Sequence, residues 1–500
     1  MVNEQLEREI AKENIIRIPI VTARETDQMH IYQNGIFIHE RFDTIIKQII
    51  KEIANETIID GSNNQTRKYN LNISGQNLII DFIKSFTYCS LDDFDSNERI
   101  INLKNGLYYL DGYEGILPNP TTENGNYEAK AGDKLIRGTK YFRSHEDYIK
   151  EYKKPYKSLI QIPVNYDPKA ENLEIDQIFS DIFGFNTIPL IYEMIGYFLL
   201  PSKIYSKAFM LYGETGTGKT TAINIITQLI GFENISGIEL QKLDDKFELE
   251  KTRNKLINIF DDLSSKPIKY VGNFKKLVTN TWLYGRIKFI QEEIKWINRC
   301  KGLFACNVLP KIKEYVTDAF YTRWVLIPCF NDMKELRKKE EDPIKRREFS
   351  KIREKEYSEE ELSGLFNKCI QAIRRLEERG SFPEEWQDID YVRDYWNMDI
   401  NPVSTFIEEC CNKGDSYEIN YEQFYTQLNR FRKEKRVKEI TKTLMTRSLT
   451  KLGIEKVDKG SKVDKEDRYV FRGIQFKLEY ATEHLEIAEK DNLVKYINEV

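Results

Sequence analysis

The stretch Gly213-Glu214-Thr215-Gly216-Thr217-Gly218-Lys219-Thr220 decides the fold of the chain around it. It matches the pattern G-x-x-x-x-G-K-[ST] at every fixed position. The apolar run 207–212 before it has the length of a strand, and residues 221–230 after it have helical spacing. Glycines let successive N–H groups turn toward a phosphate, and the following helix adds its positive end. The stretch therefore predicts a P-loop nucleotide site between a buried strand and a helix.

The residue types in this loop predict its contacts. Lys219 is expected to reach the β- and γ-phosphates of ATP, and the hydroxyl of Thr220 is expected to hold Mg²⁺. The predicted nucleotide-binding residues are Gly213, Glu214, Thr215, Gly216, Thr217, Gly218, Lys219, Thr220 and Thr221.

Composition sets the broad class of the protein. The 500 residues predict two to four domains. The 76 Lys and Arg side chains face 80 Asp and Glu, a net charge of -4, so any surface for nucleic acid has to be local. Seven cysteines without a C-x-x-C pair and only four histidines disfavour a structural zinc. The charged first residues and the absence of a bilayer-length apolar run predict a cytoplasmic protein without a membrane partner.

A second apolar run, residues 256–260, ends in two carboxylates about forty residues beyond the loop. Hydrolysis of a phosphoanhydride needs one acid to orient the magnesium shell and another to polarise the attacking water. We assign these tasks to Asp261 and Asp262, with Thr220 and Asp261 as the predicted metal ligands.

Two further polar residues border buried strands. Asn307 follows the apolar run 302–306 and is expected to contact the γ-phosphate or the lytic water, although a turn residue before Pro310 would look the same. Arg323 precedes the strand-like run 325–327. It is either a structural ion-pair arginine or a finger that reaches the phosphate of a neighbouring subunit.

The first part of the chain mixes helical and strand-like pieces. Residues 42–54 predict a helix, and the alternation around Asn105-Gly106 predicts a hairpin. Asp93-Phe94-Asp95 has the spacing of a metal-binding acid pair for a primase, but the surrounding polar run favours a solvated acidic loop.

Helices are predicted over residues 173–183 and 188–200, ahead of the P-loop strand. The highly charged residues 333–355 predict a solvated helix or lid. Ser358 is placed to cap a helix that runs to Gly380.

The last part of the chain predicts a winged helix. Helices are expected over 403–410, 421–431 and 440–452, followed by strands at 453–457 and 468–471. The clearest local basic patch lies on the second and third helices and the linker between them. Its members are Arg430, Arg432, Lys433, Lys435, Arg436, Lys438, Lys442, Arg447 and Lys451, of which Arg432, Lys433 and Arg436 are predicted DNA contacts.

These patterns divide the chain into six parts. They are an α+β N-terminal region without a convincing primase site (1–155), a helical lead-in (156–200), the ATPase core (201–335), a charged helical linker (336–395), the winged helix (396–480) and a helical tail (481–500).

The phosphate loop, the Asp-Asp strand and the Asn-x-x-Pro strand, all within about a hundred residues, resemble superfamily 3 helicases. The resemblance is closest to the phage, plasmid and poxvirus primase-helicase branch, and it covers about residues 100–475. Asn105-Gly106, the segments 163–168 and 192–197, and the terminal winged helix resemble that branch as well. The resemblance implies an α/β P-loop NTPase core of AAA+ type, assembled as a hexameric ring that travels 3′ to 5′ on single-stranded DNA.

The same resemblance implies a DNA-gripping hairpin within residues 275–289. Lys288 falls on the position of the family's DNA-contacting lysine, with Arg286 and Phe289 beside it. Asn280-Thr281 replaces the family's usual Gly-Asp, and Thr322 stands where an arginine is common.

The leading hypothesis is a replicative DNA helicase of a mobile element. It hydrolyses ATP with Mg²⁺, binds single-stranded and forked DNA, and works with a separately encoded primase or polymerase. The main alternative is an ATP-dependent origin-binding initiator or loader that unwinds little. A small-molecule P-loop kinase is disfavoured because it needs neither the winged helix nor the Asn-x-x-Pro strand.

Overall fold

A computed structural model describes most of the chain. The described residues are 2–39, 44–56, 58–60, 66–68, 71–118, 135–264, 266–286, 293–312, 318–329, 331, 333, 355–400, 402–434, 442–460, 468–478 and 480–481.

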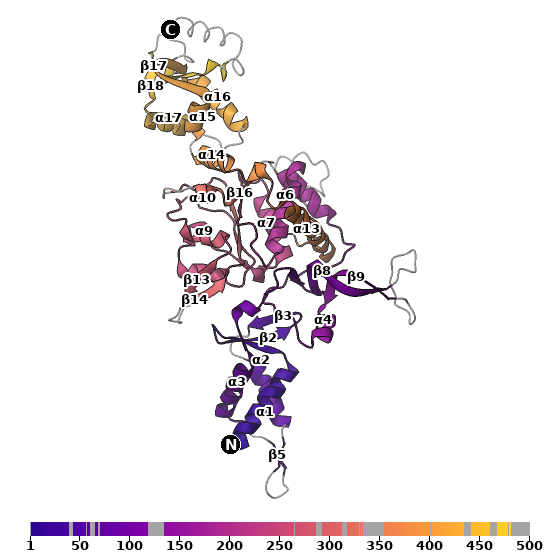
Figure 1. Ribbon diagram of the computed structural model, residues 1–500. Helices are drawn as coiled ribbons and strands as arrows, with labels where there is room; N and C mark the ends of the chain where they lie inside the picture. The colour runs from indigo at the N-terminus through magenta and orange to yellow at the C-terminus, as the bar shows by residue number, and fades with distance from the viewer. Residues whose placement is uncertain are drawn as a thin grey trace.

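A five-stranded parallel sheet forms the centre of the molecule (Figure 1). Its strand order is β11-β12-β15-β10-β16. The strands are β10 (Ala208–Tyr212), β11 (Ile235–Ser236), β12 (Ile257–Phe260), β15 (Lys301–Cys306) and β16 (Trp324–Pro328). β10 is buried along its whole length, as the uninterrupted apolar run before the loop predicts. The predicted α/β class is confirmed, and the structure shows that the central sheet is parallel.

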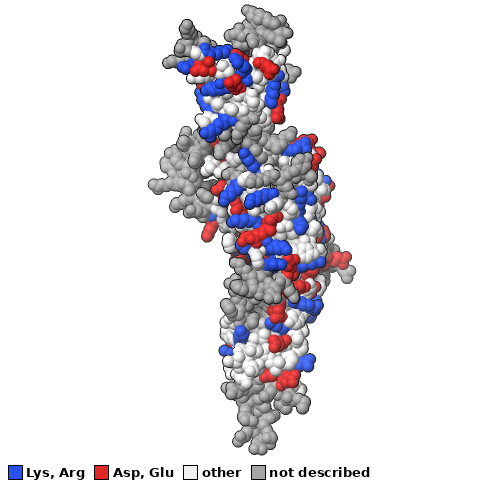
Figure 2. Space-filling view, turned by 90° about the vertical axis from the view of Figure 1, so that its left-hand side faces the viewer, with Lys and Arg blue, Asp and Glu red and all other residues white. Residues whose placement is uncertain are grey.

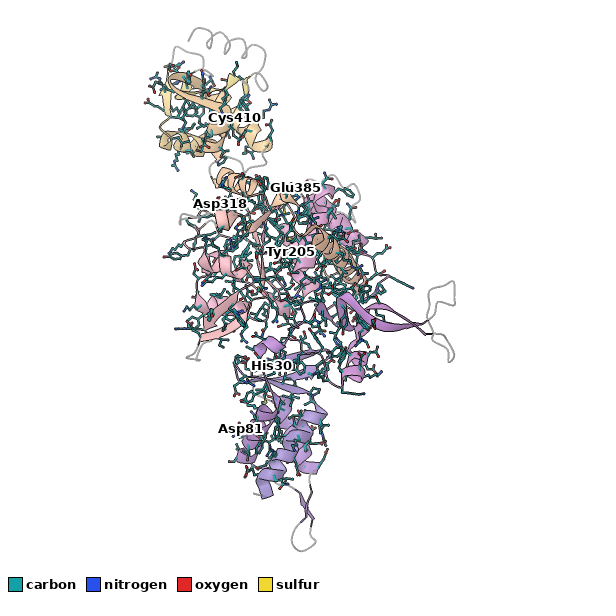
Figure 3. All side chains as sticks on the ribbon, viewed as in Figure 1. His30, Asp81, Tyr205, Asp318, Glu385 and Cys410 are labelled. Atoms are coloured by element: carbon teal, nitrogen blue, oxygen red, sulfur yellow. The ribbon has the colours of Figure 1, made fainter. Side chains whose placement is uncertain are left out.

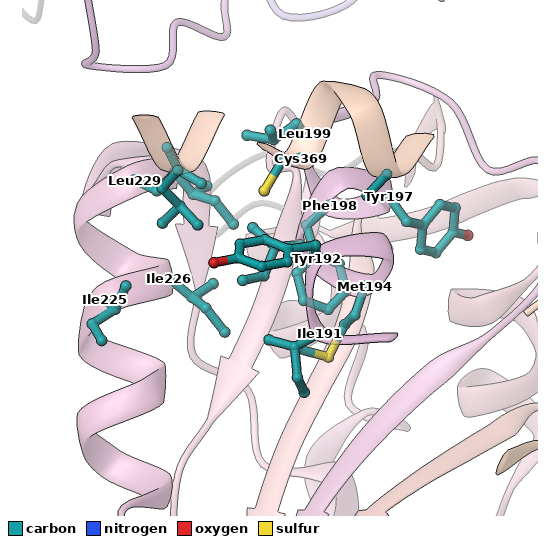
Figure 4. Close-up of a cluster of buried hydrophobic side chains, with 14 of the residues drawn as sticks. Ile191, Tyr192, Met194, Tyr197, Phe198, Leu199, Ile225, Ile226, Leu229 and Cys369 are labelled. Atoms are coloured by element: carbon teal, nitrogen blue, oxygen red, sulfur yellow. The ribbon is translucent and has the colours of Figure 1, made fainter. Parts of the chain in front are cut away.

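Four helices pack on one face of this sheet. They are α5 (Leu173–Phe183), α6 (Ile188–Leu199), α7 (Lys219–Ile230) and α13 (Glu359–Arg379). Figure 4 shows side chains of α6 and α7 meeting around Cys369 of α13. Gly196 lets α6 and α13 approach closely, since a Cβ there would lie 2.8 Å from the Cys369 carbonyl oxygen. Ser358 caps α13 by accepting a hydrogen bond from the Glu361 N–H, as predicted.

The other face carries an aromatic core. It is covered by α9 (Gly272–Val278), α10 (Asp318–Tyr321) and α14 (Ile389–Ile400). Trp324 stacks on Phe274 at 4.6 Å between ring centroids, and Trp396 lies 5.5 Å from Trp324. The Trp396 indole N–H donates to the Pro310 carbonyl oxygen at 3.0 Å, which satisfies this buried donor.

The N-terminal part contains two small sheets of four and three strands, and a separate two-stranded pair. The first has the order β3-β2-β1-β6 and packs with α1 (Val2–Arg17), α2 (Thr44–Glu56) and α3 (Ile73–Thr87). Its strands are β1 (Ile20–Ala23), β2 (Gln28–Gln33), β3 (Ile36–His39) and β6 (Tyr88–Cys89). A short antiparallel pair joins β4 (Ile58–Asp60) to β5 (Thr66–Lys68).

The second small sheet contains the predicted hairpin. β7 (Ile100–Leu103) and β8 (Gly106–Pro118) pair antiparallel, with Leu103 opposite Gly106, so the predicted hairpin is confirmed, but its turn residues are Lys104 and Asn105 and not Asn105 and Gly106. β9 (Leu135–Ser144) pairs with β8 and leads into α4 (His145–Tyr152).

The prediction of a solvated acidic loop at residues 93–95 is wrong for Asp95. Its carboxylate is buried, accepts a hydrogen bond from the Ser158 hydroxyl and accepts another from the Leu159 N–H at 3.0 Å. Burial raises the pKa of Asp95 to about 6. Asp93 lies 3.4 Å from the Lys157 ammonium. Among the residues that the structure describes, no group of three or more His, Cys, Asp or Glu side chains is arranged to hold a metal ion.

The C-terminal part is a compact unit of helices on a three-stranded antiparallel sheet. Its elements are α15 (Pro402–Cys410), β17 (Cys411–Asn420), α16 (Tyr421–Glu434), α17 (Lys442–Lys451), β18 (Glu455–Asp458) and β19 (Tyr469–Phe476). The sheet order is β17-β19-β18. The three predicted helices and two predicted strands are present, and β17 is an additional strand that the sequence did not predict.

The molecule is elongated, with the two ends of the described chain far apart and the parallel sheet between them (Figure 1). Figure 3 places His30 and Asp81 in the N-terminal part, Tyr205 in the centre and Cys410 in the C-terminal unit. Arg99 of the N-terminal part binds Asp111 of β8 at 2.9 Å and also pairs with Glu377 of α13. Within the described ranges, no single helix has the length and apolar composition needed to cross a bilayer.

Candidate nucleotide site

The phosphate loop connects β10 to α7 and depends on its glycines. A Cβ on Gly213 would lie 2.0 Å from the Cys329 carbonyl oxygen, and one on Gly218 would lie 2.6 Å from Ile182. Gly216 and Gly218 have φ values of +95° and +90°, a region that side chains disfavour. The loop therefore curves tightly between β16 and α5, with α7 beginning at Lys219.

The Lys219 ammonium lies against the backbone of its own loop. It donates to the carbonyl oxygens of Gly213 at 2.7 Å and Glu214 at 2.9 Å. Burial lowers the pKa of Lys219, and the opposing influence of Cys329 and the nearby carboxylates is smaller. These carbonyl contacts hold the ammonium next to the space enclosed by the loop, where the phosphates of a nucleotide are expected.

Thr220 joins the loop to the acid strand. Its hydroxyl donates to Asp261 Oδ2 at 2.7 Å, across the gap between α7 and the end of β12. A hydroxyl and a carboxylate side by side are hard oxygen donors of the kind that Mg²⁺ prefers, so the residues present fit the predicted ion. Asp262 follows with φ +61° and an exposed side chain, which turns the chain sharply after the strand.

Asn307 lies beside the loop because of the strand order. β15 is the direct neighbour of β10, with Cys306 opposite Tyr212, and the Gly213 N–H donates to the Cys306 carbonyl oxygen at 3.3 Å. Asn307 is the next residue and therefore stands at the same edge of the sheet as Gly213. Parallel strands bring their carboxyl ends to one edge, and the sites of such sheets lie there.

Arg323 lies at the opposite end of the strands, where the strands of the sheet begin. Its carbonyl oxygen accepts from the Ala208 N–H at 2.7 Å, at the start of β10, whereas the phosphate loop follows the end of β10. A strand of this length spans about 13 Å between its end residues. The Arg323 guanidinium donates to the Ala319 carbonyl oxygen, and burial lowers its pKa. The structure thus does not bring Arg323 together with the loop of its own chain.

The other predicted positions vary in setting. Glu214 and Thr215 are exposed at the outside of the loop, while Thr217 and Thr221 are buried. The Thr217 hydroxyl donates to the Glu214 carbonyl oxygen at 2.9 Å and so braces the loop from within.

Sequence reasoning missed residues that shape the loop from outside. The Met333 N–H donates to the Gly216 carbonyl oxygen at 3.2 Å, and Ile182 of α5 faces Gly218. Met333 was included in the charged segment 333–355, most of which lies outside the described residues. Ile182 lies in the predicted helix 173–183, but the apolar spacing of that helix did not place it against the loop.

A hairpin lies between the acid strand and the Asn strand, but its bounds differ from the predicted segment 275–289, because Lys275 and Lys276 lie in α9 and the second hairpin strand begins at Glu293. β13 (Trp282–Arg286) pairs antiparallel with β14 (Glu293–Ile297), and Arg286 stands opposite Glu293 at 3.6 Å. Lys288 and Phe289 lie outside the described residues, as does Arg436 of the C-terminal unit.

Several of the described basic side chains of the C-terminal unit pair with carboxylates. Lys442 binds Glu422 at 2.6 Å, and Arg430 binds Glu434 at 3.0 Å. Arg432 lies 3.4 Å from Asn429, and Lys433 is exposed.

Comparison with known proteins gives partial matches. A family model described as a family of unknown function (DUF5906) matches residues 211–323. The chain is 32% identical over 106 residues to AAA-ATPase At3g28570, mitochondrial, of Arabidopsis thaliana, covering 20% of this chain and 22% of that protein. It is 30% identical over 122 residues to AAA-ATPase At3g28610 of the same plant, covering 24% and 23%. The chain spans less than a quarter of the length of these curated relatives.

Solved structures give a longer but weaker match. The A form apo structure of the NrS-1 C terminal region aligns with 94% of this chain and 98% of its own, at 14% identity and a TM-score of 0.44. A further apo structure of that region aligns at 15% identity and a TM-score of 0.41. In sequence, a stretch of about a fifth to a quarter of this chain is similar to proteins named AAA-ATPases, and the fold of the chain's centre is α/β with a parallel sheet.

Proposed function

We propose that this protein is an ATP-driven DNA helicase of a mobile element, which works as a ring on single-stranded DNA. The observation that carries the proposal is the position of the β13–β14 hairpin, inserted between the acid strand β12 and the Asn strand β15 of one P-loop core. This arrangement puts the hairpin in the same unit as the hydrolytic groups. ATP hydrolysis itself is supported by the similarity to proteins named AAA-ATPases.

The site residues divide the chemistry of hydrolysis among them. Thr220 and Asp261 would hold Mg²⁺, whose contribution when bound is to neutralise phosphate charge. Lys219 exchanges its carbonyl contacts for phosphate oxygens. Asp262 polarises the attacking water, and Asn307 orients the water or the γ-phosphate from the neighbouring strand.

Arg323 is proposed to act on the nucleotide of a neighbouring copy. Its place at the far end of the strands supports this, because its own phosphate loop lies at the other end of β10. An arginine supplied in trans stabilises the charge that develops during phosphoryl transfer. The site is then complete only at a contact between two copies, which agrees with the hexamer expected from the sequence.

The C-terminal unit is proposed to be a winged helix that contacts DNA. Its support is the element order α15-β17-α16-α17-β18-β19 together with the antiparallel sheet β17-β19-β18. In such a unit the helix before the last two strands enters the major groove. Thr443 and Arg447 are exposed on α17 and suit this role.

The remaining expectations from the sequence belong to this proposal. They are the six-part division of the chain, a cytoplasmic location, no membrane partner, and cooperation with a separately encoded primase or polymerase at a forked DNA substrate.

The deciding experiment measures ATP hydrolysis with and without single-stranded DNA, together with strand displacement on a forked duplex. The proposal expects DNA to stimulate hydrolysis and strands to separate, and Lys219→Ala serves as the inactive control. Hydrolysis with binding to duplex but without displacement would favour an origin-binding loader. An ATP hydrolysis rate that no DNA changes, without DNA binding, would overturn both the helicase and the loader proposals and would favour a small-molecule kinase.

A further inference from the structure

The β13–β14 hairpin has two different faces. Leu283, Ile294 and Trp296 point inward and are buried in the aromatic side of the core. Trp282 and Tyr284 point the other way and are 41% and 49% exposed. Large aromatic side chains on one open face of a two-stranded sheet are unusual for a purely structural hairpin, because their burial elsewhere would stabilise the fold.

Lys295 fixes the orientation of an aromatic ring on this outward face. Lys295 is the cross-strand partner of Tyr284, and its ammonium lies 4.0 Å from the centroid of the Trp282 ring. A cation at this distance from an indole is attracted by the ring and restricts its orientation. The face therefore presents a positioned indole, a phenol ring and an ammonium within one short stretch of sheet.

The surroundings of the face are positively charged. Residues 266–286 and 293–300 carry seven Lys or Arg and, as acidic residue, Glu293. Glu293 is already engaged by Lys246 at 2.5 Å. Among the described residues, Lys275, Lys276 and Lys295 form no close ion pair with a carboxylate, although Lys295 attracts the Asp92 carboxylate at longer range. Figure 2 looks at the side that bears α9, β13 and β14 in Figure 1 and shows Lys and Arg side chains over the middle of the molecule, with Asp and Glu among them.

We propose that this outward face is a stacking platform for single-stranded nucleic acid, on which Trp282 and Tyr284 each receive a base and Lys295 meets the adjoining phosphate. The inference rests on the proposed function and adds a contact surface at the base of the hairpin to the contacts expected at its tip. Aromatic side chains combined with unpaired cations are the combination by which proteins hold single strands without regard to sequence.

The spacing of the two rings selects single strands over duplex. Alternate residues of a strand are about 6.8 Å apart along its axis. Stacked bases in a duplex are about 3.4 Å apart along one strand, so two neighbouring bases reach both rings only when they are unstacked from each other. A protein partner would instead need acidic groups to match the lysines, and a second copy of this chain offers mostly basic residues in the same region.

The test measures binding of a fluorescently labelled oligo-dT to the full-length protein by anisotropy, across a series of salt concentrations. Trp282→Ala and Tyr284→Ala are each expected to weaken binding roughly tenfold at every salt concentration. Trp282→Phe is expected to keep most of the affinity. Lys295→Gln is expected to reduce the slope of log affinity against log salt by about 0.7, since one phosphate contact is lost. Phe232→Ala, which removes another aromatic side chain that is 79% exposed, is the matched control and should bind normally.

The outcomes separate this inference from the proposed function. Normal binding by both alanine variants, with binding by the wild type, would overturn the platform and leave the helicase proposal standing. A change in sedimentation of the alanine variants with unchanged oligo-dT affinity would also overturn it and assign the face to a contact between copies. Failure of the wild-type protein to bind oligo-dT would overturn both proposals. Basal ATP hydrolysis, measured in parallel, shows that each variant has kept its fold.

Discussion

At the scale of single residues, Lys219 contacts the loop backbone in the structure and the phosphates in the proposed reaction. In the structure its ammonium satisfies two carbonyl groups of the loop, and in the proposed reaction it moves to the phosphates. Removal of this donor takes away charge stabilisation at the reacting group, so Lys219→Ala should lower the ATP hydrolysis rate by about 10²- to 10³-fold. A phosphate-release assay checks this, with the exposed Lys242→Ala as control. Near-normal turnover by Lys219→Ala would refute the assignment of the loop.

Two glycines near the site differ in the space that they leave. A Cβ on Gly213 would collide with the Cys329 carbonyl oxygen, whereas a Cβ on Gly237 would meet the Ile259 carbonyl oxygen at 3.8 Å. Gly213→Ala should cost about 1–3 kcal/mol of stability, because the backbone has to shift, and should weaken ATP binding. Gly237→Ala should stay within about 0.5 kcal/mol of the wild type. Chemical denaturation and nucleotide titration of both variants measure these effects, and equal behaviour of the two would contradict the close packing at Gly213.

Sequence predicted residue types better than residue environments. The P-loop pattern pointed to Thr220 and the apolar strand before the acid pair pointed to Asp261, and the structure brings their oxygens to 2.7 Å. It gave no warning that Asp95 is buried, because the partner Ser158 lies 63 residues further along the chain. The burial of a polar side chain depends on such distant partners and not on the polarity of its neighbours in sequence.

At the scale of elements, the helices were easier to predict than the strands. The bounds of α5 and the cap of α13 follow from apolar spacing and from Ser358 and Gly380. β17 was missed because Asn412, Gly414 and Asp415 disfavour strands, and its pairing with β19 shifts register between Lys413 and Glu418. Pairing with a strand more than fifty residues away overrides this local preference, which no single segment reveals.

A buried lysine at the start of β15 makes the stability of the core depend on pH. Lys301 donates to the Leu200 carbonyl oxygen at the end of α6, and burial lowers its pKa to about 7 from the usual 10.5. The unfolded chain then binds the proton more tightly than the folded protein does. Below about pH 7, the burial of Lys301 lowers the free energy of unfolding by its full amount. The free energy of unfolding then rises as the pH increases from about 7 to about 10.5.

Replacement of this lysine by an apolar side chain should remove that pH dependence. The methionine of Lys301→Met does not titrate. The melting temperature of the wild type should therefore rise relative to that of the variant between pH 7 and pH 10. Differential scanning calorimetry across this range measures the difference, with the exposed Lys311→Met as control. A difference that stays constant with pH would mean that Lys301 titrates as an ordinary lysine.

At the scale of the whole molecule, the hydrolytic groups lie at opposite ends of the strands of one sheet. Asp262 stands at the end with the phosphate loop, and Arg323 stands at the other. Arg323→Ala and Asp262→Asn should each be nearly inactive alone, and a mixture should recover activity. In a 1:1 mixture about a quarter of the contacts between copies join an intact Asp262 to an intact Arg323. Hydrolysis rates across mixing ratios measure the recovery, and its absence at every ratio would make Arg323 a structural residue.

The separation of Arg323 from the loop of its own chain has a consequence for the protein in its host. Under the proposed assembly, a single copy lacks the arginine that completes its own site. Newly made protein is therefore inactive until its concentration is high enough for the ring to form. Specific activity then falls steeply on dilution. A copy that is damaged in both groups inactivates two junctions, the one that it should catalyse and the one that it should complete, so damaged copies silence up to twice as many sites as they contribute.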